Sequence, residues 1–372
     1  MFLVVSRNFP PDIGGMQILM GNLSESLAKH DTVKVFANKF PNSEMYDKKS
    51  FTSIERISGI KIFLKYRKAN LVNNFIKKNK NIKAVFFDHW KSIELINKNY
   101  LKENKTFCLI HSKEINHTEG TWLNKRVVKS LNKADYVIAN SRFTKELAIK
   151  IGINKIKIKV INPGINAPKK IENSFKDEAN QYWNDSSTLK EAFPKIITVA
   201  RLEKRKNHDK ILMTIKNLIP KFPNIKYISI GDGEEKNNLI KLKNELNLKN
   251  NIIFLNNISE EKKLSLLASS NLFLMPSIID KKSVEGFGIS FIEAASYGIA
   301  SIGGKDGGAS DAIVHNNTGL ICDGNNLNSI YDSVINFFDE DKFIKLGKAA
   351  LKYSESFHWE KVVKNYLNLI KS

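Results

Sequence analysis

The sequence predicts two α/β domains in tandem, each built on a doubly wound parallel sheet. The chain has 372 residues, which is enough for two domains of ordinary size. Short apolar runs alternate with helical patterns along nearly the whole sequence, as expected when helices cover both faces of a parallel sheet. This alternation stops at the breaker Asn162-Pro163-Gly164 and resumes at residue 195.

The first predicted domain covers residues 1–165. Its strands are expected at residues 2–5, 32–36, 60–64, 83–87, 106–110, 136–139 and 156–161. Helical patterns lie between several of these runs, for example at residues 17–29 and 142–151. Because the strands and helices alternate, the strands should run parallel within one sheet.

The second predicted domain covers residues 195–353 and follows a polar linker or excursion at residues 166–194. Its strands are expected at residues 195–200, 227–230, 251–255, 272–275, 300–302 and 319–322. Residues 354–372 have the pattern of an amphipathic helix. Two such domains in tandem are expected to leave a cleft at the carboxyl ends of their strands, where open α/β sheets bind ligands.

The formal charge of +21 has two interpretations. Lysine, asparagine and isoleucine are abundant, and AT-rich coding DNA would produce that bias without any binding function. An excess of this size would also attract anionic lipids, phosphates or nucleic acid. A basic nucleic-acid-binding protein is therefore the alternative from another class, although we find no recognised module and no basic face with interleaved aromatic residues.

The most one-sided basic stretch begins at Lys61 and ends at Lys83. It holds eight Lys or Arg residues and no acidic residue. One helical face of this stretch would carry Val72, Phe75, Ile76 and Asn79. The stripe is typical either of a surface helix packed on its own domain or of a docking face for an anionic membrane surface.

Targeting and redox signals are weak in this sequence. No apolar run approaches the length of about 18 residues that a membrane-spanning helix needs. The opening apolar run, residues 1–5, fits a first buried strand better than a signal peptide. Cys108 and Cys322 lie far apart and share no ligand-like spacing with histidines, which favours a reducing cytoplasm over a disulfide or zinc scaffold.

The most informative segment for chemistry runs from Glu285 to Glu293, in Glu-Gly-Phe-Gly-Ile-Ser-Phe-Ile-Glu. It follows a predicted strand, and Gly286 and Gly288 allow the backbone to approach a ligand closely. A helix is expected to begin near Gly288, so that its free amides point at the ligand. Carboxylates are pure acceptors, which suits the hydroxyl groups of sugars and ribose.

Five segments together resemble the retaining GT-B glycosyltransferases called family 4 or group 1. Glu285 and Glu293 match the E-x7-E signature of that family, with Phe287 between the two glycines. Residues 9–15, ending in Gly14-Gly15, resemble its amino-terminal glycine loop. The segment at His111 resembles its strand-end histidine motif, although Ser112 stands where glycine is usual. The two other segments are Val199-Ala200-Arg201-Leu202 with Lys206, and the closing Phe357-His358-Trp359.

This resemblance implies a role for each matching residue. Arg201 and Lys206 would hold the donor diphosphate, and the amides of Gly14 and Gly15 would approach the leaving phosphate. Glu285, with the backbone of Gly286, Phe287 and Gly288, would hold the donor sugar. Glu293 would bind the nucleotide ribose, and His111 would contact the sugar or the acceptor. The terminal helix would cross back over the first domain.

The resemblance also implies front-face displacement with retention of configuration. The departing phosphate would take the acceptor proton, and Arg201, Lys206 and backbone amides would stabilise its charge. The spelling Asp-x-Asp occurs only at Asp339-Glu340-Asp341, which falls between helices and should be solvated. We therefore expect no metal and no other cofactor.

The donor and acceptor are less constrained. Residues 302–311 resemble a segment of GDP-mannose-dependent members of the family, including phosphatidylinositol mannosyltransferases, so a GDP-sugar carrying mannose is the first expectation and a UDP-sugar the second. The acceptor is expected to be a saccharide or a lipid-linked sugar in envelope polysaccharide or glycolipid synthesis, met by a peripheral enzyme on the inner face of the cytoplasmic membrane. A sugar-nucleotide epimerase, a phosphorylase or an inactive relative remain alternatives within the same fold.

Overall fold

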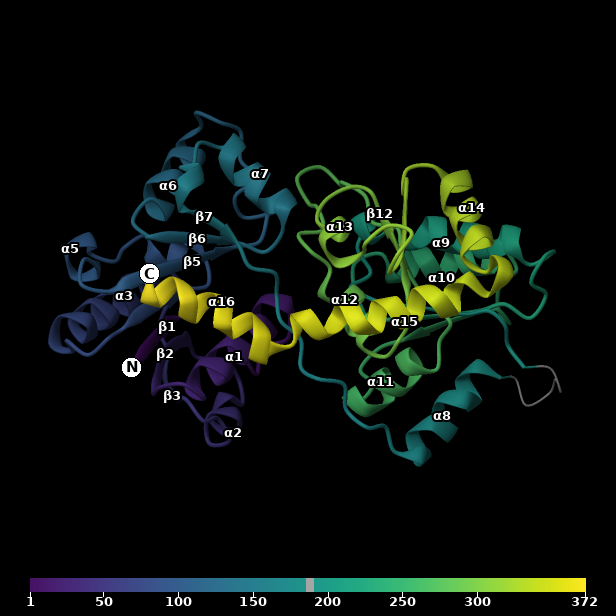
Figure 1. Ribbon diagram of the computed structural model, residues 1–372, viewed down its shortest axis with the longest axis horizontal. Coiled ribbons are helices and arrows are strands. Elements are labelled where there is room, and N and C mark those ends of the chain that lie inside the picture. The colour runs from purple at the N-terminus through teal and green to yellow at the C-terminus, as the bar shows by residue number, and fades with distance from the viewer. Residues whose placement is uncertain (185–190) are drawn as a thin grey trace. The chain divides into compact units, whose positions relative to one another are not determined.

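The structure is a computed structural model that describes residues 1–184 and 191–372 (Figure 1). The chain forms two compact units. Unit 1 comprises Met1–Gly164 together with Phe357–Ser372, and unit 2 comprises Ile165–Ser356. Each unit has its own parallel sheet and its own hydrophobic core.

Unit 1 is built on a seven-stranded sheet with the order β3-β2-β1-β4-β5-β6-β7, in which every pairing is parallel. Its strands are β1 (Phe2–Val5), β2 (Val33–Asn38), β3 (Ser53–Ile57), β4 (Ala84–Phe87), β5 (Lys105–Ile110), β6 (Tyr136–Ala139) and β7 (Ile158–Val160). Its helices are α1 (Gly15–Ala28), α2 (Ser43–Asp47), α3 (Lys61–Lys78), α4 (Trp90–Ile93), α5 (Lys98–Leu101), α6 (Trp122–Leu131), α7 (Arg142–Lys150), η1 (Lys155–Lys157) and α16 (Trp359–Lys371). Apolar clusters on both faces bury strands such as β1 and β4 completely.

Unit 2 is built on a six-stranded parallel sheet with the order β10-β9-β8-β11-β12-β13. Its strands are β8 (Lys195–Val199), β9 (Lys226–Ile230), β10 (Ile252–Leu255), β11 (Leu272–Met275), β12 (Ser301–Gly304) and β13 (Gly319–Cys322). Its helices are α8 (Asn173–Trp183), η2 (Lys204–Lys206), α9 (His208–Leu218), α10 (Lys236–Glu245), α11 (Glu260–Ala268), α12 (Ile289–Ser296), α13 (Ala309–Ala312), α14 (Leu327–Phe337), η3 (Asp339–Asp341), α15 (Lys342–Ser354) and η4 (Glu355–Phe357), which ends at the first residue returned to unit 1.

Both sheets reverse their direction of growth at one point. In unit 1 the chain moves outward from β1 to β3 and then returns to place β4 beside β1. In unit 2 it moves outward from β8 to β10 and returns to place β11 beside β8. Loops that follow the two central strands therefore diverge, and ligands of open α/β sheets bind at this switch point.

One predicted strand is wrong. Residues 60–64 were predicted as a strand, but the first turns of α3 occupy them, and the side chains of Ile62 and Phe63 are 70% and 65% exposed. The third strand is β3, which pairs with β2 at the sheet edge. Only Ile57 of β3 is buried, so this strand lacks the apolar run that marks a central strand.

The structure also bears on two further predictions, one for residues 166–194 and one for α3. The sequence predicts a linker or excursion at residues 166–194, whereas residues 173–183 form helix α8, in which Ala179 and Trp183 are buried. Residues 185–190 of that segment lie outside the described residues. In α3, Val72 and Ile76 belong to the core of unit 1, so the predicted apolar stripe packs on its own domain.

The terminal helix α16 completes the core of unit 1. Its amphipathic face buries Trp359, Val362, Val363 and Tyr366. The Tyr366 ring packs edge-on against Phe86 and Phe107, with centroid separations of 5.9 and 6.1 Å. Gly164 is required beside this helix, because a Cβ there would lie 2.6 Å from the Trp359 ring. Figure 1 shows α16 alongside α1, a contact made within unit 1.

Candidate active site

Three loops meet at the switch point of unit 2. The loop after β8 leads into η2, the loop after β11 leads to α12, and the loop after β13 contains Gly324. The backbone amide of Ile278 donates to the Arg205 carbonyl at 2.9 Å. The Asn207 amide group donates to the carbonyls of Pro276 and Gly324 at 2.9 and 2.7 Å. These bonds fix the ends of β8, β11 and β13 against one another.

Glu285 lies at the centre of this junction in a buried ion cluster. Its Oε2 accepts from the Lys206 ammonium and, at 2.8 Å, from Nη1 of Arg205. The Lys206 and Glu285 side chains are only 8% and 12% exposed. Burial by itself would raise the pKa of Glu285, but the Lys206 and Arg205 charges outweigh it and lower that pKa to about 2. Glu285 is therefore ionised at neutral pH.

Arg201 lies at the solvent end of the same cluster. Its Nη1 is 3.0 Å from Oε1 of Glu203, and Oε2 of Glu203 is 3.0 Å from Nε of Arg205. The Arg201 side chain is 77% exposed, so an incoming anion could reach it. The predicted residues Lys206 and Glu285 are thus in direct contact, and Arg201 is linked to them through two residues that sequence reasoning missed, Glu203 and Arg205.

The glycine-rich turn before α12 has the predicted form. Gly288 precedes the helix with φ 89°, a left-handed conformation that favours glycine, and α12 begins at Ile289. Phe287 is buried beneath this turn. Glu293 lies one and a half turns into α12 and is partly buried, and burial raises its pKa. The charges that act on Glu293 are those of Lys263 and Glu260 on α11, not those of the Glu285 cluster.

A second glycine segment holds Glu285 by its backbone. The Gly308 amide donates to the Glu285 carbonyl at 2.8 Å. Gly307 has φ 87°, and a Cβ there would lie 2.4 Å from the same carbonyl oxygen. A Cβ at Gly304 would lie 1.9 Å from the Ser277 carbonyl oxygen. Residues 302–311 therefore have a reason for their glycines within the fold, whatever the donor sugar.

The remaining predicted residues lie in unit 1. Gly14 caps α1 and Gly15 is its first residue. His111 follows β5, where its Nε2 lies 3.3 Å from the Asp88 carbonyl oxygen. Ser112 has φ 85°, which explains why glycine is usual at this position, and its hydroxyl group hydrogen-bonds that of Thr144 at 2.6 Å. The structure groups these residues within unit 1 and the Glu285 cluster within unit 2.

Sequence reasoning missed Asp88, a buried carboxylate at the switch point of unit 1. Its Oδ2 accepts from the amides of Arg7 and Asn8, at 2.7 and 3.3 Å, and from the Ser6 hydroxyl at 2.9 Å. Its Oδ1 accepts from the Ser92 hydroxyl at 2.6 Å. Asp88 therefore fastens the loop after β1 to the end of β4. A lone aspartate after a strand gave no signal of this function.

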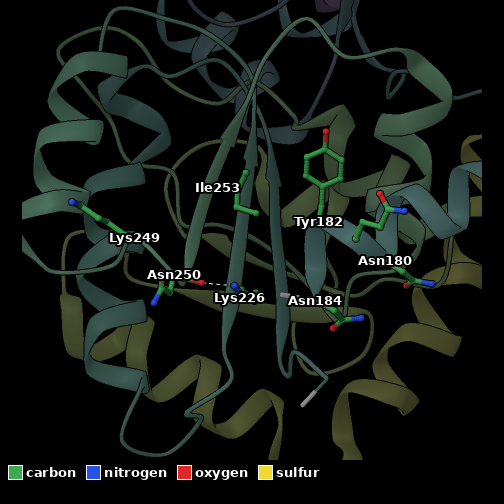
Figure 2. Close-up of a pocket in the computed structure, with 8 residues that line it drawn as sticks. Asn180, Tyr182, Asn184, Lys226, Lys249, Asn250 and Ile253 are labelled. Atoms are coloured by element: carbon green, nitrogen blue, oxygen red, sulfur yellow. Dashed lines mark hydrogen bonds between the residues drawn. The ribbon is translucent and has the colours of Figure 1, made fainter. Parts of the chain in front are cut away.

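One cavity of unit 2 lies away from this chemistry. It has a volume of ≈ 760 Å³ and is open to solvent (Figure 2). Its lining includes Tyr182 of α8, Lys226 at the start of β9, and Asn250 just before β10. These strand positions mark the amino-terminal edge of the sheet, opposite the Glu285 cluster. None of the predicted site residues lines it.

Among residues 1–184 and 191–372, no group of three or more His, Cys, Asp or Glu side chains is arranged to hold a metal ion. Asp339 and Asp341 lie in the exposed turn η3 between helices, as predicted. Within the same ranges, no helix combines the length and apolarity needed to span a bilayer. Cys108 and Cys322 are buried free thiols.

Two protein-family models match the chain in succession. Residues 13–168 match the model described as Glycosyltransferase Family 4, and residues 180–354 match the model described as Glycosyl transferases group 1. The boundary between the two matches lies near the boundary between the two units.

Curated relatives are similar at low identity. The GDP-mannose-dependent alpha-(1-6)-phosphatidylinositol monomannoside mannosyltransferase of Mycobacterium tuberculosis is 26% identical over 171 residues, which are 45% of this chain and 44% of that relative. The protein of the same name from Mycolicibacterium smegmatis is 22% identical over 338 residues, 89% of this chain and 87% of that relative. The chain thus matches less than half the length of the first relative and most of the second.

Solved structures share the fold over the whole chain. HepE of Anabaena in complex with UDP has a TM-score of 0.82 at 16% identity, covering 100% of this chain and 99% of that one. Sucrose-phosphate synthase of Thermosynechococcus elongatus has a TM-score of 0.77 at 18% identity, covering 100% and 98%. At these identities the likeness establishes the fold alone.

Two Rossmann-like parallel-sheet domains of this kind define the GT-B class, and this chain has the GT-B fold. The matched families then place it within that class. The chain is a glycosyltransferase and belongs to the group 1 and family 4 glycosyltransferases.

Proposed function

We propose that this glycosyltransferase moves a hexose from a nucleoside diphosphate sugar to a saccharide or lipid-linked acceptor with retention of configuration. One observation carries the proposal: a buried glutamate and three cations are assembled at the switch point of unit 2. Such a cluster has both kinds of group that a sugar diphosphate needs, namely cations for the phosphates and a carboxylate for sugar hydroxyls.

Each residue of the cluster has a proposed role. Arg201 binds the diphosphate with its guanidinium fork, and Lys206 adds a point charge at the cluster's centre. Glu285, with the backbone of residues 286–288, holds the sugar hydroxyls. Glu293 binds the ribose. In unit 1, His111 contacts the sugar or the acceptor, and the amides of Gly14 and Gly15 contact the departing phosphate.

The reaction breaks the bond between the anomeric carbon and the β-phosphate oxygen. The acceptor oxygen forms its bond to the same face of that carbon, and its proton passes to the departing phosphate. The cations stabilise the negative charge that develops on the leaving diphosphate. No metal ion is required in this scheme, so transfer should continue in excess chelator.

GDP-mannose is the proposed donor. The mycobacterial relatives are named for GDP-mannose and a mannosyl product, and residues 302–311 resemble a segment of such enzymes. HepE, which shares the fold, is described in complex with UDP, so a UDP-sugar is the second choice. A thermal-shift comparison of GDP and UDP decides between them, because a ligand that binds only the folded chain raises its melting temperature.

A lipid-linked acceptor at the inner face of the cytoplasmic membrane fits the start of α3. Ile62, Phe63 and Tyr66 are 70%, 65% and 49% exposed there, beside basic Lys65 and Arg67. Exposed aromatic residues beside basic residues are typical of surfaces that bind anionic lipid. Co-sedimentation should detect more binding to phosphatidylglycerol vesicles than to phosphatidylcholine vesicles.

Substitution tests the membrane surface. The double variant Phe63→Ser/Tyr66→Ser should lose most vesicle binding, whereas Ile344→Ser, which removes a 45%-exposed apolar residue from α15, should retain it. Equal binding of both vesicle types by the unmodified chain would exclude an anionic membrane surface.

A transfer assay tests the enzyme assignment. The chain is incubated with GDP-mannose or a UDP-hexose and a panel of saccharide and lipid-linked acceptors, and the free nucleoside diphosphate is measured. Release that requires an acceptor supports the proposal. Rapid change of the donor sugar without acceptor would identify an epimerase, and dependence on free phosphate would identify a phosphorylase.

A further inference from the structure

Three cations at the switch point of unit 1 lack anionic partners. Arg7 follows β1, Lys65 lies on α3, and Lys91 lies on α4. Within the described ranges, neither an ion pair nor a hydrogen bond involves the charged group of any of the three; Lys65 and Lys91 lie over the rings of Tyr66 and Trp90. Neighbouring Arg126, in contrast, pairs with Glu94 at 2.6 Å.

The loops that carry Arg7 and Lys91 are fixed by hydrogen bonds. Asp88 accepts from the Arg7 amide at 2.7 Å, and the Lys91 amide donates to Nδ1 of His89 at 2.9 Å. Lys68 reaches from α3 to the Ser6 carbonyl at 2.7 Å. The backbone positions of the cations are therefore set before any ligand arrives, which reduces the ordering cost of binding.

The charges of these residues act on one another. Burial lowers the pKa of Lys91, and the charges of Arg7, Arg126 and Lys65 lower it further, while Glu94 opposes them. Burial also lowers the pKa of Lys68 to about 8, with Asp88 opposing and Arg7 adding to the effect. Asp88 has its oxygens occupied by the four donors from Ser6, Arg7, Asn8 and Ser92. Among the described residues, no acidic side chain thus contacts the charged groups of Arg7, Lys65 and Lys91, although the charges of Asp88 and Glu94 act nearby.

His89 supplies a neutral donor at the same place. It is 6% exposed, and burial lowers its pKa to about 3, against the opposing charge of Asp88. Because its Nδ1 accepts from the Lys91 amide, the ring proton of the neutral form belongs on Nε2. In the part of the chain that the structure describes, this Nε2 has no hydrogen-bond partner.

We propose that Arg7, Lys65, Lys91 and the His89 Nε2–H bind a phosphate group carried by the acceptor. This assignment rests on the proposed function and names its acceptor class: a phosphate ester or phosphodiester. An arginine fork and two ammonium groups match the several oxygens of a phosphate, whereas the neutral hydroxyls of an uncharged saccharide need no such charge.

The test uses the full chain and the double variant Arg7→Gln/Lys91→Gln. The matched control is Lys216→Gln/Lys221→Gln, which removes two charges from exposed positions of unit 2. GDP or UDP, whichever raises the melting temperature, is present at saturation. The nucleotide site is then occupied, so the phosphate probes cannot bind there. Two probes are titrated: soluble glycerol 3-phosphate by calorimetry, and phosphatidylglycerol vesicles by co-sedimentation.

The unmodified chain and the control should bind at least one probe with the same affinity within a factor of about two. The Arg7→Gln/Lys91→Gln variant should bind it at least about tenfold more weakly, a loss of about 1.4 kcal/mol. Binding of glycerol 3-phosphate would identify a free phosphate ester as the source, and binding of vesicles alone would identify a lipid headgroup. The arginine-retaining variant Lys91→Gln should fall between the two.

Two results would overturn the assignment: no binding of either probe by the unmodified chain, or equal binding by the chain and the Arg7→Gln/Lys91→Gln variant. A retained response to nucleotide in these experiments would show that the proposed donor site survives when the phosphate site fails. If neither nucleotide binds, the proposed function fails, and the titrations without nucleotide still decide the phosphate site.

Discussion

Each of the two switch points of this chain has a buried carboxylate, but the two carboxylates have different kinds of partner. In unit 2, Glu285 faces cations, and the alternating charges from Arg201 to Lys206 largely neutralise one another. In unit 1, Asp88 faces two backbone amides and two hydroxyl groups, and the nearby cations stay free. The same strand topology thus supports a charge-balanced cluster in one unit and a cationic edge in the other.

The difference in partners suggests a structural role for Asp88 and a ligand-binding role for the Glu285 cluster. Asp88 is occupied in holding loops, so its neighbours Arg7 and Lys91 remain available to an anion. In the proposed function, a bound diphosphate offers Lys206 and Arg201 an anionic partner other than Glu285 and Glu203, with which they are now paired. Substitutions in the two clusters should therefore have different signatures.

Loss of Glu285 should have the largest effect. Glu285→Ala leaves the buried Lys206 ammonium with no carboxylate contact, which should cost about 3–5 kcal/mol of folding stability. Sugar transfer should fall by about 10²–10³-fold, as for loss of one preorganised charge contact. Urea unfolding and the transfer assay measure the two effects.

The double variant Lys206→Met/Glu285→Gln is the matched control for that substitution. Without a buried unpaired charge, it should recover most of the stability lost in Glu285→Ala but none of the activity. An unchanged urea midpoint in Glu285→Ala would show that the ion pair is not buried as described.

Acid should erase the difference between the unmodified chain and Glu285→Ala. The pKa of Glu285 is lowered from 4.5 to about 2 in the folded chain, so its contribution is complete above pH about 4.5 and is lost as pH falls toward 2. The gap in melting temperature should stay constant from pH 7 to about 5 and then narrow. Burial also lowers the pKa values of His89 and His208, to about 3 and about 4, but this loss is common to both proteins. A gap that widens below pH 4.5 would contradict the ionised Glu285.

Loss of Asp88 should reduce folding stability less than loss of Glu285 does, and it should not change nucleotide binding. Asp88→Asn can keep the Arg7 and Asn8 amides on its oxygen and turn its NH2 group toward the Ser92 hydroxyl, but it replaces charged hydrogen bonds with neutral ones, which should cost about 1.5–3 kcal/mol. The shift in melting temperature caused by nucleotide should stay as large as in the unmodified chain. A lost nucleotide response would mean that the loop after β1, which Asp88 fastens, is needed to position the Gly14 and Gly15 amides for the diphosphate.

Arg201→Ala should have the smallest effect on folding. This side chain is 77% exposed and its ion pair with Glu203 should contribute only about 0–1 kcal/mol. Transfer should nevertheless fall by about 10²-fold, because the proposed contact is with the leaving diphosphate. Arg205→Ala is the informative partner variant: it removes one of the two cations from Glu285, so it should destabilise the chain more than Arg201→Ala does.

Much of this architecture was predictable because the central strands are buried and mostly apolar. The apolar runs at β1, β8 and β11 are recognisable in the sequence as strands, and Gly288 indicates where α12 begins. The edge strand β3 was missed because only Ile57 of its five residues is buried, and the exposed apolar residues at the start of α3 were mistaken for a strand.

The site was predictable only in part, for a related reason. Glu285 and Lys206 stand out through motif spacing, and the structure brings them into contact, although their roles in transfer remain predictions. Arg205 and Glu203 were hidden in a lysine-rich stretch, where no local pattern tells a buried cation from a solvated one. Asp88 was hidden because its partners Arg7 and Asn8 lie about eighty positions earlier in the chain.

The return of residues 357–372 to unit 1 has a consequence for how the protein is made. During synthesis the amino-terminal unit emerges first, yet Trp359, Val362 and Tyr366 must fill its core before that unit is complete. The surface that α16 covers stays exposed while all of unit 2 is translated. A chain that stops before Trp359 would therefore lose part of the core of the unit that was synthesised first, and aggregation of nascent chains should be most sensitive to substitutions at that exposed surface.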